Sequence, residues 1–109
     1  MSRGMRLRHQ QADVAADDLI GRNAAYAASY TADRPLPPRL KLAVVACMDS
    51  RLDVFAMLGL EIGDAHIIRN GGGVVTDDVI RSLVVSQRKL GTEEVILVHH
   101  TNCGSLTFT

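Results

Sequence analysis

Two short stretches of this sequence concentrate residue types that bind metals and exchange protons. The first, VACMDSRLD, places Cys47, Asp49 and Arg51 at alternate positions, and the second, VHHTNCGSL, combines a pair of histidines with Cys103. Two thiolates and one imidazole would form a Cys₂His set, and three protein ligands with one open position are typical of a catalytic zinc site. The alternative is that both cysteines are buried and behave as small hydrophobic residues.

Asp49 and Arg51 add a carboxylate and a guanidinium to this set. Residues two apart in an extended backbone face the same side, so an ion pair between them is geometrically easy. Arg51 can hold Asp49 as a carboxylate that accepts a hydrogen bond from a metal-bound water or hydroxide. The alternative is a surface turn whose salt bridge has little energetic value.

Three short apolar runs predict the strands of the scaffold. The run at residues 41–47 is nearly continuous, which is typical of a strand buried on both faces. The predicted strands are KLAVVAC, AHIIRN and EEVILVHH. Two helical segments alternate with them: LDVFAMLGL, closed by Gly59, and DDVIRSLVVSQRKL, with Thr76 as N-cap and Gly91 as C-terminal cap.

The alternation of strands and helices predicts a parallel α/β sheet with right-handed crossovers. If the first strand is central, the chain reverses direction between the first and third strands, and ligands bind at such a switch point, beyond the carboxyl ends of the strands. Cys47 ends the first strand, whereas the histidine pair and Cys103 follow the third. This topology would therefore bring the two stretches together.

The glycine run in RNGGGVVTDD resembles a phosphate-binding loop only superficially. It lacks the GK[ST] signature, and Asp77 and Asp78 would lie where a bound anion should be placed. We interpret the run as a backbone constraint that lines a cleft.

Composition and charge narrow the classes of function. The 109 residues are 47% hydrophobic and carry no formal net charge, so the chain should form a single domain (1–109) and nothing indicates a nucleic acid or a membrane as partner. Two widely separated cysteines indicate reduced thiols and a cytoplasmic protein. We expect a flexible basic arm at 1–9, an N-terminal helix at 10–31 and a zinc-binding core at 40–109.

Three motifs, CMDSRLD, RNGGGVVTDDVIRSL and HHTNCG, together resemble those of the β-class carbonic anhydrases, from about Leu40 to the end of the chain. The resemblance implies one zinc ion per chain, an Asp/Arg catalytic dyad, and a zinc-bound hydroxide that converts carbon dioxide to bicarbonate and a proton, a lyase reaction. It implies an α/β fold with a parallel-centred sheet flanked by helices, an N-terminal helical arm, and a homodimer or higher homo-oligomer. The implied ligands are Cys47, His100 and Cys103, and the implied dyad is Asp49 and Arg51.

The sequence departs from the family pattern at three places. Asn102 replaces a common aspartate beside the ligands, and Gly73 stands where a bulkier residue is usual, which we expect to loosen the cleft wall. The chain stops at Thr109, whereas family members continue, so we expect a C-terminally truncated member whose third strand lacks cover. Alternative functions are an inactive zinc-binding remnant, a hydrolase of a linear substrate such as carbon disulfide, and a plain nucleotide-binding α/β domain.

The implied ligand set leads to a prediction about pH. Two thiolates neutralise Zn²⁺ formally, so they withdraw less charge from a bound water than three neutral histidines do. We therefore predict that the rate of carbon dioxide hydration rises with pH through a midpoint above the value of about 7 that is typical of a His₃ site. Stopped-flow assays across this range measure the midpoint, and a profile already saturated at about pH 6.5 would contradict the prediction.

Overall fold

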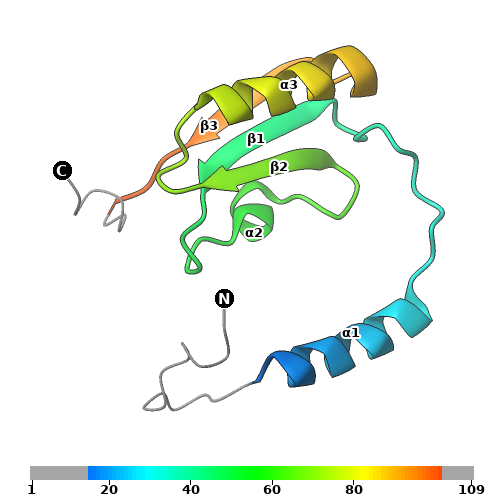
Figure 1. The fold of residues 1–109 in the computed structure, drawn as a ribbon. Coiled ribbons are helices and arrows are strands. Elements are labelled where there is room, and N and C mark those ends of the chain that lie inside the picture. Colours follow the sequence, from blue (N-terminus) through cyan, green and yellow to red (C-terminus); the bar gives the residue numbers. More distant parts are fainter. Residues whose placement is uncertain (1–14, 102–109) are drawn as a thin grey trace. The chain divides into compact units, whose positions relative to one another are not determined.

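The computed structural model describes residues 15–101 and divides the chain into two units, residues 1–33 and 34–109 (Figure 1). In the first unit, α1 (Ala16–Ser29) begins with two acidic residues, which suit the positive end of the helix dipole. The part of the predicted N-terminal helix at residues 10–14 and the predicted basic arm at 1–9 lie outside the described residues. No helix within residues 15–101 combines the length and the hydropathy needed to cross a bilayer.

The second unit is a three-stranded parallel sheet in the order β2-β1-β3, so the prediction that the first strand is central is confirmed. Its elements are β1 (Leu42–Cys47), α2 (Val54–Leu58), β2 (Ala65–Asn70), α3 (Asp77–Leu90) and β3 (Glu94–Val98). The first crossover runs from the central strand β1 to β2, and the second runs from β2 past β1 to β3, so the two run in opposite directions across the sheet. Crossovers of the same hand then place their helices on opposite faces, and Figure 1 shows α2 and α3 arranged in this way.

The core is built around β1, all six of whose residues are buried, as the apolar run predicted. Alternate side chains of β1 lie on one face and form a cluster with residues of α2 and β3. This cluster consists of Leu42, Val44, Ala46, Val54 and Val98. The edge strand β3 is different, because Val95, Ile96 and Leu97 are 36–54% exposed. Within residues 15–101, the third strand is thus only partly covered.

Both helices of the second unit end as the sequence predicted. The Thr76 hydroxyl accepts a hydrogen bond from the backbone N–H of Val79 at the start of α3, and Gly91 ends that helix in the left-handed region with φ = 77°. Asp53 caps α2 in the same manner, and Gly59 ends it with φ = 64°. These signals are local, which is why the bounds of α3 could be predicted to the residue.

A buried carboxylate ties the connector that precedes β1 to the start of β2. Asp64 accepts hydrogen bonds from Nε of Arg39 and from the backbone N–H of Glu61, both at 2.9 Å. The Arg39 side-chain hydrogen bond, reinforced by the Glu61 amide, lowers the pKa of Asp64 below its ordinary value. The proline-rich connector is thus fixed at the amino ends of the strands, opposite the end that carries the candidate site.

The glycine run packs against the carboxyl ends of β1 and β3. Gly73 is buried and has φ = 65°, and a Cβ atom there would lie 2.9 Å from the backbone nitrogen of Cys47 and 3.1 Å from the carbonyl oxygen of Val98. Asn70 closes the loop with side-chain hydrogen bonds to the backbone N–H and carbonyl of Val74. The interpretation as a backbone constraint is confirmed. The expectation that Gly73 loosens the wall is wrong, because the absence of a side chain allows a closer approach than any other residue would.

This contact predicts the effect of Gly73→Ala. The alanine must adopt a left-handed conformation and also press its Cβ against backbone atoms, so we expect a loss of about 2–4 kcal/mol in the free energy of unfolding. Gly91→Ala is the matched control, because φ is 77° there and nothing lies within 4 Å of the added Cβ. Chemical denaturation of both variants measures the difference. Equal destabilisation of the two would contradict the close packing of Gly73.

Candidate metal centre

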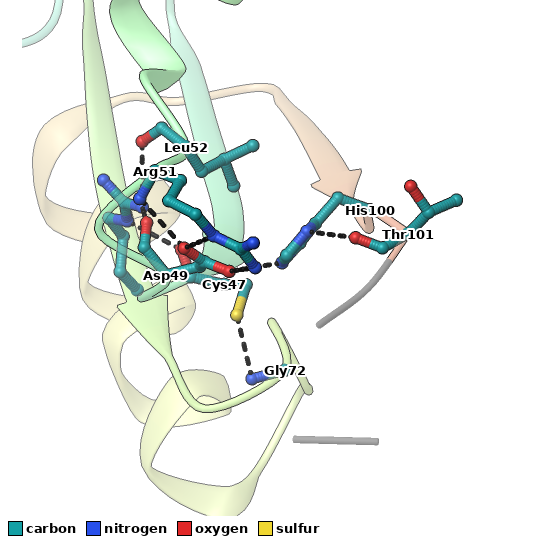
Figure 2. Close-up of polar contacts among 8 residues, drawn as sticks. Cys47, Asp49, Arg51, Leu52, Gly72, His100 and Thr101 are labelled. Atoms are coloured by element: carbon teal, nitrogen blue, oxygen red, sulfur yellow. Dashed lines mark hydrogen bonds and ion pairs between the residues drawn. The ribbon is translucent and has the colours of Figure 1, made fainter. Parts of the chain in front are cut away.

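The carboxyl ends of the parallel strands β1 and β3 lie at the same edge of the sheet, and the predicted site residues follow them. Figure 2 shows the Asp49 carboxylate between the Arg51 guanidinium and the His100 ring. A pocket of about 170 Å³ opens at this edge and is lined by Asp49, Arg51, Leu52, His100 and Thr101. The structure thus brings residues from both sequence stretches to one pocket.

The ion pair between Asp49 and Arg51 is a two-pronged contact. Arg51 donates from Nε to Oδ1 at 3.0 Å and from Nη2 to Oδ2 at 2.6 Å, and its backbone N–H also donates to Oδ1 at 2.9 Å. The side chain of Asp49 is only 13% exposed, whereas that of Arg51 is 68% exposed. The hydrogen bonds from Arg51 hold the pKa of the Asp49 carboxyl well below its usual range. Asp49 is therefore an ionised acceptor at any physiological pH.

His100 has one ring nitrogen engaged and the other directed at this carboxylate. Nδ1 lies 2.9 Å from the Thr101 carbonyl oxygen, which can only accept, so Nδ1 is the donor in this contact and Nε2 is the nitrogen that can offer a lone pair to a metal. Nε2 is buried and has no hydrogen-bond partner among residues 15–101, and it lies 3.8 Å from Oδ2 of Asp49. A buried lone pair without a donor is what a metal ligand requires before the metal binds.

Cys47, the last residue of β1, is 3% exposed, and its sulfur accepts a hydrogen bond from the backbone N–H of Gly72 at 3.4 Å (Figure 2). The thiolate is the form of cysteine that binds metals, and a sulfur in that form can keep this N–H donor. Sequence reasoning missed this contact, because its donor is a backbone group.

The predicted ligand set lies partly within the described residues. Cys47 and His100 are placed by β1 and β3, whereas Cys103 and its neighbour Asn102 lie outside residues 15–101. Within that range, no three residues of the His, Cys, Asp and Glu types gather closely enough to hold a metal ion. The donor types nevertheless suit zinc, which is bound by thiolates and imidazoles.

His99, which the sequence left as a competitor for the metal, makes a different contact. Its Nε2 lies 3.3 Å from the carbonyl oxygen of Gly73, to which it can only donate. His99 thus holds the glycine loop, and of the two adjacent histidines only His100 lines the pocket.

Comparison with known proteins finds matches to carbonic anhydrases. The sequence profile of the carbonic anhydrase family matches residues 42–109. Beta-carbonic anhydrase 1 of Mycobacterium tuberculosis is 60% identical over 93 residues, which are 85% of this chain and 57% of the relative. A carbon disulfide hydrolase of Acidianus sp. is 49% identical over 74 residues, which are 68% of this chain and 36% of that protein.

The structural comparison agrees with these matches. The crystal structure of a carbonic anhydrase from Streptococcus mutans superposes with a TM-score of 0.79 at 57% identity, over 85% of this chain and 57% of that one. The chain thus spans little more than half the length of these two carbonic anhydrases. The matched profile, the sequence identity and the shared arrangement of strands and helices place this chain in the β-class carbonic anhydrase family.

Proposed function

We propose that this protein catalyses the reversible hydration of carbon dioxide to bicarbonate and a proton, with one zinc ion held by Cys47, His100 and Cys103. The observation that carries the proposal is the buried Nε2 of His100, which has no hydrogen-bond partner among residues 15–101, beside a carboxylate that Arg51 keeps ionised. Family membership supports the same reaction. The third ligand, Cys103, rests on the sequence resemblance alone.

Zinc bound at this position would supply the Lewis acidity that makes water a nucleophile near neutral pH. Cys47 contributes a thiolate whose charge the Gly72 amide helps to stabilise. His100 contributes Nε2, because the hydrogen bond from Nδ1 to the Thr101 carbonyl fixes the tautomer and the orientation of the ring.

Asp49 is suited to orienting the nucleophile rather than to storing its proton. A general base that holds a proton in turnover needs a pKa near the working pH. The hydrogen bonds from Arg51 keep the pKa of Asp49 far below that range, so its carboxylate can accept a hydrogen bond from the nucleophile but cannot retain a proton. Arg51 fixes the direction of both oxygens of the Asp49 carboxylate at the pocket. Asp49 and Arg51 together therefore act as the catalytic dyad in our proposal.

We also propose that the protein is a cytoplasmic homodimer or higher homo-oligomer. Two features support self-association: none of the residues of α1 is buried, and three consecutive apolar residues of β3 are exposed. Large exposed apolar surfaces mark interaction sites in soluble proteins. The two cysteines, far apart in the sequence, support a reducing compartment.

The variant Asp49→Asn tests the proposed role of the dyad. The amide keeps the size of the side chain but loses the charge and can present a donor to the nucleophile, so we expect kcat/KM for carbon dioxide hydration to fall by about 100-fold or more. Asp53→Asn is the matched control in the same loop, because asparagine also caps a helix and α2 should be preserved. Stopped-flow hydration assays on the zinc-loaded full chain provide the measurement.

The outcomes separate the competing functions. Saturable hydration that Asp49→Asn abolishes and Asp53→Asn retains supports the proposal. Zinc binding without turnover in the unsubstituted chain would instead identify an inactive remnant. Carbon disulfide should be assayed in parallel, because relatives named carbon disulfide hydrolases are 46–49% identical to this chain over 72–74 residues, and faster turnover of that substrate would contradict the assignment to carbon dioxide.

A further inference from the structure

A second arginine, Arg69, contacts the loop that carries the candidate site. It lies on β2 opposite Ala46 of β1, so the two side chains share one face of the sheet. The small, fully buried side chain of Ala46 leaves room for the long arginine side chain to pass over it. Arg69 can therefore reach beyond the end of β1, although its own strand contributes nothing to the pocket.

The guanidinium of Arg69 donates to three carbonyl groups of this loop. Nε donates to the Cys47 carbonyl at 2.8 Å, and Nη2 donates to the carbonyls of Asp49 at 2.8 Å and Leu52 at 3.1 Å. The Cys47 carbonyl ends β1, and the carbonyls of Asp49 and Leu52 belong to the irregular segment between β1 and α2, which lies outside the sheet. One planar cation thus replaces the sheet hydrogen bonds that end with β1.

We propose that Arg69 is a positioning residue for the candidate centre, because it fixes the backbone on which Cys47, Asp49 and Arg51 are mounted. Its task differs from that of Arg51, which binds the carboxylate of Asp49, whereas Arg69 binds the main chain. The inference rests on the site of the proposed function, but the contacts of Arg69 lie within the chain itself and can be tested without bound metal. Displacement of a metal ligand's support typically weakens metal binding by about 10- to 100-fold.

We expect the Arg69→Lys variant to keep only part of the positioning effect of Arg69. The three acceptors are reached from two different nitrogen atoms of a rigid fork, and a lysine ammonium is a single point on a flexible stem. Arg69→Met removes all donors while keeping most of the apolar stem. Arg88→Met, in the last turn of α3, is the matched control, because it removes the same group far along the chain from the loop.

Amide hydrogen exchange by NMR on the metal-free full chain is the decisive measurement. The reporters in the loop are the amides of Arg51, which donates to Asp49 Oδ1, and Leu52, which donates to the Asp49 carbonyl at 3.0 Å. In Arg69→Met we expect exchange at both amides to accelerate about tenfold or more, with an intermediate effect in Arg69→Lys. The amides of Val44 and Val45 should change no more than in Arg88→Met.

Two results would overturn the proposal. One is unchanged exchange in the loop, and the other is an equal acceleration in the loop and in β1, which would mean that Arg69 stabilises the whole unit and not the site. Full recovery in Arg69→Lys would also refute the requirement for a fork. The zinc dissociation constant, measured by chelator competition, should rise about tenfold or more in Arg69→Met.

These readouts separate the inference from the proposed function. If the chain does not hydrate carbon dioxide but Arg69→Met loosens only the loop, the positioning role stands and the catalytic proposal fails. If hydration is observed and the loop amides do not respond, the positioning role fails and the catalytic proposal stands.

Discussion

The burial of β1 on both faces is the constraint on which the candidate centre depends. A strand buried in this way needs a neighbour on each edge and a helix over each face, and the order β2-β1-β3 with its two crossovers meets that need. The same order makes the end of β1 the point where the chain reverses direction. The loop that follows Cys47 meets His100 there because the hydrophobic core requires this topology, independently of the chemistry of the site.

Polar contacts take over where the apolar strand ends. Arg51 fixes a carboxylate, the glycine run seals the ends of β1 and β3, and backbone groups orient the sulfur of Cys47 and the ring of His100. Each of these contacts limits the freedom of a group that would otherwise rotate in solvent. The pocket is therefore organised by the protein itself, which is the condition for efficient electrostatic stabilisation of a reaction.

Much of this arrangement could be predicted from the sequence because its signals are local. The apolar run ending at Cys47 predicted two-sided burial, Thr76 and Gly91 predicted the ends of α3, and the spacing of Asp49 and Arg51 predicted their ion pair. The predicted end of β3 was wrong, because the predicted strand extended into the histidine pair whereas the observed one ends at Val98.

The contacts that could not be predicted join a side chain or a glycine to a distant backbone. Gly73 was expected to loosen the site, yet it allows the close approach to Cys47, a residue on another strand. Arg69 gave no signal because carbonyl acceptors occur in every residue type. The role of Cys103 stays a prediction, since this residue lies outside the described part of the chain.

The zinc-to-protein ratio of the full chain tests the central claim most directly. The protein would be isolated by size-exclusion chromatography as a single soluble species, and its zinc content would be measured by elemental analysis. The account predicts a ratio near one, because β1 ends at Cys47, His100 lines the pocket beyond the end of that strand, and Cys103 would complete the proposed ligand set. A ratio near zero in well-folded protein would contradict it and show that these residues do not form a zinc site in this chain.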